Sequence, residues 1–227
     1  MKLFLFVISI ISFTKVIAQS PGVVNVLWQS EWNNQPLQLS TPYLTTDDAT
    51  IEFEQIKMYV SGFKLLNNEQ IVWQEQNSFH LLDFSDLNST NWKWTIPSNI
   101  DYNKIQFTFG IDSLTQVSGV QGGPLDPTTG MYWTWQTGYI HLKLEGKSDR
   151  CPARNNQFQI HLGGYAAPHN TAHQVTLPVI NKQDIGIVIP WDGFISSTDL
   201  SHTHHIMSPG VTADERATFL CKIFMTK

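Results

Sequence analysis

The chain has 227 residues, of which 41% are hydrophobic, 12% aromatic and 15% charged, and its formal net charge is −5 at pH 7. The negative sign argues against nucleic acid and anionic membrane surfaces as partners. A chain of this length and composition can bury a large core, so we expect it to fold without a metal ion.

Residues 1–18 have the pattern of a secretory signal peptide. Met1-Lys2 is a short positive start, an apolar run extends from Leu3 to Ile11, and Val16-Ile17-Ala18 is a typical cleavage site. The apolar run is too short for a membrane-spanning helix, although an uncleaved N-terminal anchor is the alternative. We expect cleavage after Ala18, a periplasmic or secreted protein, and one mature domain over residues 19–227.

The mature chain has the pattern of an all-β protein. Strand-like runs alternate with turn signals and no linker or repeat interrupts them. The best helical pattern lies near the C-terminus, over residues 213–224, with Thr212 as a candidate N-cap. We therefore predict a single β-sandwich, Greek-key-like, with a short C-terminal helix. The expected strands are residues 23–28, 51–66, 71–73, 79–84, 105–111, 131–144, 156–162, 173–179 and 184–189.

The most distinctive segment begins at the turn Asp126-Pro127-Thr128-Thr129-Gly130. From Met131 onward the residues alternate as in a strand, which would place Trp133 and Trp135 side by side on one face, together with Thr137, Tyr139 and His141. The simpler interpretation is a core strand whose aromatic side chains fill the sandwich.

The same segment resembles the signature of a known family. It reads D-P-x-x-G-M-x-W-x-W-x-x-G-Y-x-x-x-K-L-E-G from Asp126 to Gly146, which is similar to the MbnP-like proteins, periplasmic copper-binding proteins. Further segments resemble family motifs in the family's order: Tyr59 to Leu65 (Y-x-S-x-x-K-L), His80 to Asp83 (H-L-x-D), Phe107 to Asp112 (F-x-x-G-I-D), His161-Leu162-Gly163, and the His-rich tail that ends in Met207.

The resemblance implies an exported protein that binds Cu(I) beside a tryptophan oxidised to kynurenine. It also implies a partner, a MauG-type dihaem cytochrome c peroxidase, that carries out this oxidation in some members. Trp133 and Trp135 are the positions that match the motif. We favour Trp135, because a continuous strand would place it farther from the Gly130 turn and closer to the sheet interior.

Eight histidines supply candidate copper ligands, since imidazole and thioether groups both suit copper. His80 and His161 are the best pair, because both lie in segments that resemble family motifs. His204 and Met207 are further candidates in the tail. The alternatives are histidines that only satisfy strand hydrogen bonds and a solvated tail. His169 and His173 are interpreted as surface residues.

Only two cysteines are present, Cys151 and Cys221. In an exported protein such a pair is interpreted first as a disulfide, with a thiolate copper site as the alternative.

Other functions have weaker support in the sequence. Acidic residues at Asp47-Asp48 and at Asp83 and Asp86 could bind calcium, although such pairs are more often solvated turns. The familiar hydrolase and phosphate-loop motifs are absent, so we expect no enzymatic activity. The main alternative function is a carbohydrate- or peptide-binding β-sandwich that uses exposed aromatic residues for contact.

Overall fold

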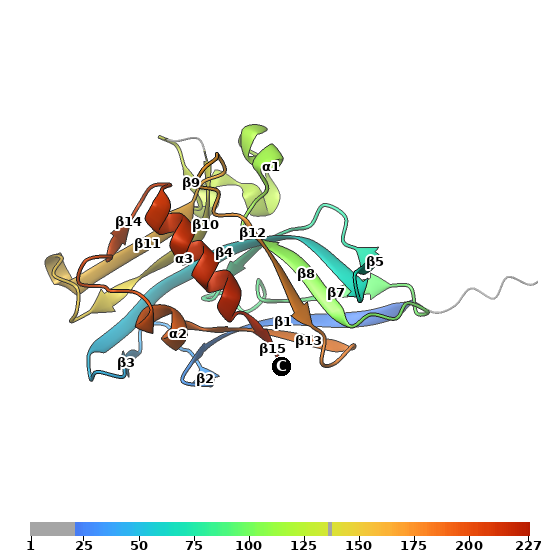
Figure 1. The fold of residues 1–227 in the computed structure, drawn as a ribbon, viewed down its shortest axis with the longest axis horizontal. Helices are drawn as coiled ribbons and strands as arrows, with labels where there is room; N and C mark the ends of the chain where they lie inside the picture. The colour runs from blue at the N-terminus through green and yellow to red at the C-terminus, as the bar shows by residue number, and fades with distance from the viewer. Residues whose placement is uncertain (1–20, 136–137) are drawn as a thin grey trace, which may run out of the picture.

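The computed structural model describes residues 21–135 and 138–227. The predicted signal peptide therefore lies outside the described residues. Two β-sheets pack against each other, and the helices cover their edges and ends (Figure 1). The smaller sheet has the order β15 (Met225–Thr226), β13 (Asp184–Pro190), β1 (Gly22–Trp32) and β2 (Gln35–Pro36), with β7 (Asn91–Ile96) also paired to β1.

The larger sheet is built around one long strand, β4 (Thr50–Asn67). Its path runs through β12 (His173–Pro178), β8 (Lys104–Phe109), β4, β10 (Gly138–Ser148), β11 (Gln157–Gly163) and β14 (His205–Ile206). Four short strands pair beside this path: β3 (Pro42–Leu44), β5 (Gln70–Gln74) and β6 (Phe79–Asp83) on β4, and β9 (Tyr132–Trp133) on β10.

Three α-helices and three 3₁₀ turns complete the described fold: α1 (Ser113–Val117), α2 (Trp191–Ser196), α3 (Val211–Ile223), η1 (Gly123–Leu125), η2 (Pro127–Thr129) and η3 (Arg154–Asn156). The C-terminal helix predicted from the sequence is confirmed as α3. Its N-cap is Gly210, so Thr212 lies inside the helix and the predicted cap is wrong.

The main core lies between the two sheets. Alternate residues of β4 face it, among them Phe53, Met58 and Phe63, and all three are fully buried. From the smaller sheet, the Trp28 ring meets Phe107 edge-on at a centroid distance of 5.1 Å. Edge-to-face contacts of this kind fix the relative placement of the sheets in addition to the apolar area that they bury.

A second apolar cluster lies on the outer face of the larger sheet, the face turned away from the main core. Residues 111–133 fold back over this face, so that Leu125, Met131 and Trp133 pack on Tyr59 and Tyr139. In Figure 1, α1 and β9 rise together from the sheet in this region. The outer face is therefore partly covered, and a side chain there can be buried without belonging to the main core.

The all-β sandwich with a short C-terminal helix is confirmed. Two features were not expected: β1 and β13 run parallel, and β7, which contains Trp92 and Trp94, is a strand that the predicted set does not include.

The predicted continuous strand over residues 131–144 is wrong. Trp133 pairs with Gly138 and Tyr132 with Tyr139, so β9 and β10 form a hairpin. The turn contains Thr134 and Trp135, while residues 136 and 137 lie outside the described residues. The residues of both hairpin strands alternate between two faces, and the segment between them has no Pro, Asn or Gly before Gly138. The alternation of the sequence therefore did not reveal the turn.

The disulfide prediction is also wrong, because Cys151 and Cys221 are both free thiols. Cys151 follows β10 in the turn toward η3, whereas Cys221 lies near the C-terminal end of α3, and these two regions lie well apart in Figure 1. Burial raises the pKa of Cys151 to about 11 and that of Cys221 to about 12. Both stay protonated near neutral pH, which argues against the thiolate copper site as well.

Thiol labelling tests this correction. Folded protein should react slowly with a maleimide, because both thiols are buried or partly buried and protonated. The same protein, denatured without a reducing agent, should take up two labels per chain. Denatured protein that takes up no label until it is reduced would restore the disulfide.

Candidate metal site

His161 is a buried histidine on the outer face, in the middle of β11. It follows the alternation of that strand, in which Ile160 and Leu162 face the core and His161 faces outward. Its Nε2 lies 2.7 Å from Oε1 of Glu145 on the neighbouring strand β10. Its Nδ1 is buried and has no hydrogen-bond partner.

The Glu145 carboxylate determines which nitrogen of His161 carries the proton. The hydrogen bond from His161 is the largest cause that lowers the pKa of Glu145, so this group is a carboxylate at neutral pH. A carboxylate only accepts, so Nε2 of His161 must donate. In a neutral imidazole the remaining nitrogen, Nδ1, then holds a free lone pair. This is the arrangement that a metal-ligating histidine uses.

A thioether lies at the next position in the sheet. Strand β14 runs parallel to β11, with Gln159 opposite His205 and Ile160 opposite Ile206. The pairing ends at Ile206, and the same register continued by one residue would set Met207 opposite His161. His205 and Met207 also line an open cleft of about 380 Å³ in front of α3. Met207 thus follows the residue paired beside His161 and lies in a cleft that solvent reaches, whereas His161 itself is buried.

The two motif tryptophans lie on the same outer face. The six-membered ring of Trp133 rests on Gly163, where an added Cβ would come within 2.7 Å of Cζ3. Gly163 follows His161 by two residues on the same strand, so both face outward. The Trp133 indole N–H is buried without a partner. Trp135 is 64% exposed, and its ring centroid lies 5.7 Å from that of Trp133.

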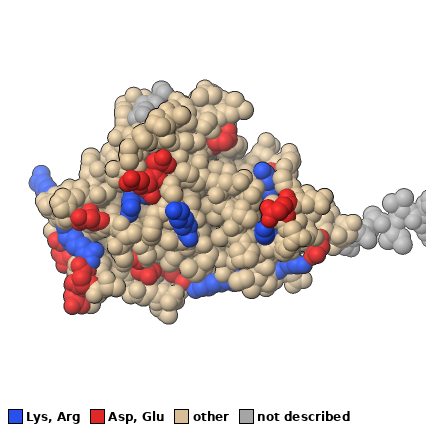
Figure 2. All heavy atoms as spheres, in the orientation of Figure 1, with Lys and Arg blue, Asp and Glu red and all other residues tan. Residues whose placement is uncertain are grey.

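These positions change the order of preference between the tryptophans. Trp135 was favoured for a place in the sheet interior, but it lies in the hairpin turn and faces solvent. Trp133 is the one on a strand and near His161. Trp135 instead lies on a nearly uncharged surface, since Ser113 to Ile140 contains a single charged residue, Asp126. Figure 2 shows correspondingly little charge on the upper part of the molecule, where α1 and β9 lie.

His80 does not lie near His161, although the sequence suggested that they share an ion. Asp83, Lys57, Lys143 and His161 form one row across β6, β4, β10 and β11. Three strand spacings separate the ends of that row by about 14 Å. His80 precedes Asp83 by three residues, so its side chain points to the opposite face. Metal–nitrogen bonds of about 2 Å cannot bridge this gap, and the shared site is wrong.

His80 has a role in the core instead. It stacks on Trp92 with 4.2 Å between ring centroids, and its Nε2 lies 2.8 Å from Oε2 of Glu75. Glu75 also accepts hydrogen bonds from Ser78 and Trp94. Burial alone would raise the pKa of Glu75, but the hydrogen bonds from these three partners lower it overall. The cluster fastens the loop between β5 and β6 to β7.

His204 also has a buried Nδ1 without a partner. It precedes buried Ile206 by two residues, and its carbonyl accepts from the Gln159 backbone N–H. Its side chain therefore lies on the core side of β14, opposite to His161. The pair His161 and Met207 does not include it.

His141 is a structural histidine behind the hairpin. Gln116 accepts from the Tyr139 backbone through Oε1, so its amide donates to Nε2 of His141 at 2.7 Å. Nδ1–H then donates to Thr171, at 2.9 Å. Complete burial lowers the pKa of His141 to about 3, so the ring is neutral. With both nitrogens occupied, it has no free lone pair for a metal.

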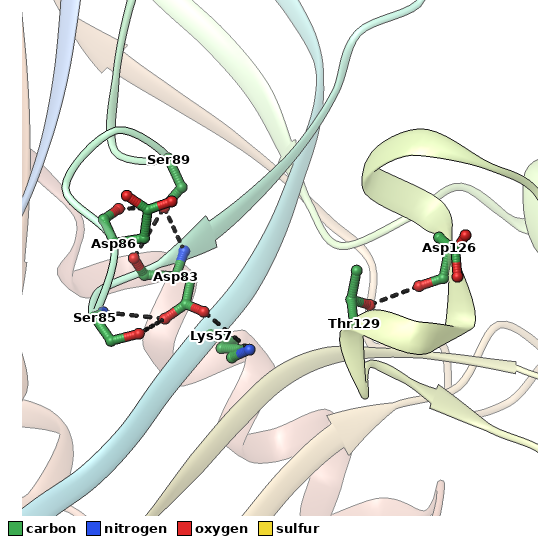
Figure 3. Close-up of polar contacts among 7 residues, drawn as sticks. All are labelled: Lys57, Asp83, Ser85, Asp86, Ser89, Asp126 and Thr129. Atoms are coloured by element: carbon green, nitrogen blue, oxygen red, sulfur yellow. Dashed lines mark hydrogen bonds and ion pairs between the residues drawn. The ribbon is translucent and has the colours of Figure 1, made fainter.

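The acidic residues proposed for calcium have other partners, and Figure 3 shows those of Asp83. The Asp83 carboxylate accepts from Ser85 and pairs with Lys57 at 2.9 Å. Burial alone would raise its pKa, but these two partners lower it overall. Asp86 accepts from Asn88, and Asp47 pairs with Arg150. Within residues 21–135 and 138–227, no three His, Cys, Asp or Glu side chains already stand at metal-ligand spacing.

Sequence reasoning missed Glu145 and Gly163 as parts of this site. Both lie inside segments that were singled out, K-L-E-G and His161-Leu162-Gly163. Their roles depend on the register between β10 and β11, where Lys143 lies opposite His161 and Glu145 opposite Gln159. The sequence offered one signal. Glu145 lies on the same predicted strand face as Lys143, and the next predicted strand along the chain carries His161.

Fold and site together define an all-β sandwich protein with a histidine–carboxylate pair, a methionine and two tryptophans on one outer face. The family model for MbnP matches residues 21–208, and the chain belongs to the MbnP family. A solved structure, MbnP from Methylosinus trichosporium, is similar in fold: TM-score 0.65, 18% identity, and 88% of each chain covered. A search of the curated proteins found no match. Among the described residues, no helix is long and apolar enough to cross a membrane.

The buried neutral His141 predicts acid sensitivity. Its pKa is about 3 in the folded protein and near 6.5 when exposed, so between these values the unfolded chain binds more protons. The free energy of unfolding should therefore fall as the pH drops below about 6.5, by at most about 1.4 kcal/mol per pH unit for this group. Urea titrations at several pH values measure it.

The matched variant for this prediction is His141→Gln. It should be less stable than the parent at pH 7, because a buried network loses a partner. Its stability should nevertheless depend less on pH between about 6.5 and 4. An unchanged pH dependence in the variant would assign the acid sensitivity to other groups.

Proposed function

We propose that this protein is an exported copper-binding protein that holds Cu(I) on the outer face of its larger sheet, through Nδ1 of His161 and the sulfur of Met207. The observation that carries the proposal is the buried, unpartnered Nδ1 of His161, whose Nε2 is held by Glu145 at 2.7 Å. A carboxylate behind a histidine fixes the tautomer and makes the ligating nitrogen more basic.

The donor set favours Cu(I) over harder ions. A thioether selects soft Cu(I), and a neutral imidazole suits copper in general. Calcium and magnesium prefer oxygen donors, which this pair does not supply. Membership of the MbnP family supports the same choice, because proteins of this type are associated with copper. We propose binding rather than catalysis as the function.

We propose Trp133 as the residue that supplies a third donor after oxidation to kynurenine. The change inserts two oxygen atoms across C2–C3 of the indole, and hydrolysis then releases C2 as formate. Two equivalents of hydrogen peroxide supply the oxygen and leave as water. The product has an aryl amine and a ketone, whereas indole is only a donor.

The proposed oxidising partner is the MauG-type dihaem peroxidase implied by the resemblance. Trp135 supports this role because its exposed ring lies 5.7 Å from that of buried Trp133. An enzyme that docks on the hairpin could thus oxidise Trp133 through Trp135. Export follows from the signal peptide proposed for residues 1–18.

The alternative, a carbohydrate- or peptide-binding module, has one supporting feature. A cleft of about 180 Å³ lies beside Trp133, lined by Tyr165, Pro168 and Pro209 among others. Its volume is below the range of about 300–1,000 Å³ that is usual for ligand sites. Copper binding therefore remains the proposal that the geometry supports better.

Competition with a Cu(I)-specific chelator tests the ligands. His161→Gln and Met207→Leu should each weaken Cu(I) binding by roughly tenfold or more, because each removes a donor at nearly constant volume. His80→Gln is the control, since this side chain faces the core. Parent affinity in both site variants, or loss of binding only in the control, would contradict the proposal.

Glu145→Gln tests the role of the carboxylate. The variant keeps the shape but can donate to Nε2 of His161, which lets the proton move to Nδ1 and blocks the ligand. We expect Cu(I) affinity to fall by roughly ten- to a hundredfold while Tm changes little. Glu54→Gln, at an exposed ion pair with Lys147, is the matched control and should bind as the parent does.

Intact-mass analysis tests the oxidation. Protein matured with its peroxidase should gain about 4 Da, because the net change on oxidation and loss of formate is one oxygen atom gained and one carbon atom lost. Trp133→Phe should abolish the gain. Trp135→Phe should slow it without abolishing it. A gain that persists in Trp133→Phe and disappears in Trp135→Phe would make Trp135 the modified residue.

A further inference from the structure

The cleft beside Trp133 leads from solvent to an indole that is otherwise buried. It has a volume of about 180 Å³, and Trp133 and Gly138 of the hairpin form one wall. The loop between β11 and β12 forms another wall, in which Ala166 and Ala167 are exposed. Trp133 itself is only 5% exposed, so the cleft is a way by which a small molecule can reach its ring.

The loop wall is held by backbone contacts. The Thr171 N–H donates to the Gly164 carbonyl, and the His169 N–H donates to the Ala166 carbonyl. Gly164 also allows a close approach to Pro209, because an added Cβ would lie 2.9 Å from the Pro209 Cβ. The wall is therefore tied at both ends, and the cleft is a built feature of the fold.

The indole of Trp133 lies with its reactive end away from β11. An added Cβ at position 163 would lie 2.7 Å from Cζ3 of Trp133 and 3.0 Å from Cη2. These two atoms form the outer edge of the six-membered ring, so the C2–C3 bond of the five-membered ring lies at the opposite end of the indole. The indole N–H, which is next to C2, is buried and has no hydrogen-bond partner. A small molecule with an acceptor oxygen would satisfy this donor.

Oxidation of Trp133 through Trp135 moves electrons but no oxygen, so the oxygen of the product must reach the ring separately. One equivalent of hydrogen peroxide accepts two electrons and two protons from the indole at the haem of the peroxidase, and it leaves as two water molecules. A second equivalent adds to C3 of the oxidised indole as a hydroperoxide and then closes on C2. Its O–O bond and the C2–C3 bond break together, which leaves a ketone and a formamide.

We propose, on the basis of the oxidation proposed above for Trp133, that the cleft is the access site for this second hydrogen peroxide molecule. Its volume suits a small oxidant: about 180 Å³ is below the range of about 300–1,000 Å³ that is usual for ligand sites, yet far above the roughly 10–15 Å³ that one water molecule needs. A hydrogen bond from the Trp133 N–H places a peroxide oxygen beside C2 and C3.

Filling the cleft from Gly138 tests this role. Gly138 lies outside the left-handed φ range, and the nearest atom to an added Cβ is 3.5 Å away in Tyr165, so Gly138→Leu should fold. With peroxidase and hydrogen peroxide, the variant should gain its mass roughly tenfold or more slowly than the parent, because the oxygen donor no longer reaches the ring. The peroxide-oxidised haem should still be reduced at the parent rate, since Trp135 is unchanged. Ala167→Leu, on the exposed loop, is a second variant if Gly138→Leu does not fold.

A matched control and an isotope label complete the test. Gly193→Leu in α2 should gain mass as the parent does, because an added Cβ there meets nothing within 4 Å and α2 lies well away from β9 in Figure 1. Hydrogen peroxide labelled with ¹⁸O, in ordinary water, should raise the gain from about 4 to about 6 Da, because the ketone keeps one peroxide oxygen.

The outcomes separate the role of the cleft from the oxidation itself. A parent that gains no mass would contradict the oxidation of Trp133 and the access role with it. A parent that gains mass while Gly138→Leu and Ala167→Leu gain it equally fast would overturn the access role alone. Slower reduction of the haem by Gly138→Leu would assign the position to the docking surface, and an unlabelled product would make water the oxygen donor. Either of these results would also overturn the access role.

Discussion

The length of β4 determines the arrangement of the larger sheet. An 18-residue strand is far longer than the usual five or six residues, and β3, β5, β6, β8 and β10 all pair with it. A strand of this length must coil, and the register shift against β8 between Ser61 and Lys64 marks where it bends. The coil leaves one face for the main core and bends the other into the outer surface that residues 111–133 cover. Every functional proposal depends on which of these two faces a side chain occupies.

Two histidine–carboxylate pairs in the same sheet illustrate this dependence. His80 with Glu75 and His161 with Glu145 have nearly the same Nε2–oxygen distance, 2.8 and 2.7 Å. His80 stacks on Trp92 among core aromatics, where its ring is a packing element. His161 lies on the outer face, near a sheet edge and a methionine. The chemistry of an imidazole is the same in both places, and the side of the sheet decides whether a ligand can approach it.

The sequence predicted local structure well wherever one period dominated. Alternating apolar residues located most strands to within a few residues, and an amphipathic segment located α3. Prediction failed where one sequence pattern fitted two different structures. The hairpin of β9 and β10 alternates on both strands, so Trp135 was assigned to a sheet interior although it lies in a turn.

The pairing of His80 with His161 failed for another reason. Motifs give the order of segments along the chain, whereas neighbouring positions across β10 and β11 depend on long-range register. Cys151 and Cys221 were paired on count and export alone, and neither argument contains a distance.

The contact between Trp133 and Gly163 has a consequence for relatives of this protein. An added Cβ at position 163 would meet the Trp133 ring at 2.7 Å and the Tyr139 carbonyl oxygen at 2.8 Å, so any larger residue there must displace the hairpin. The two positions should therefore vary together. A relative that keeps the glycine can seat an indole in the same place, and one that has alanine or serine there should carry a smaller residue at position 133 or a differently shaped hairpin. The residues at positions 133 and 163 therefore sort family members by whether they can place a tryptophan near the position of His161.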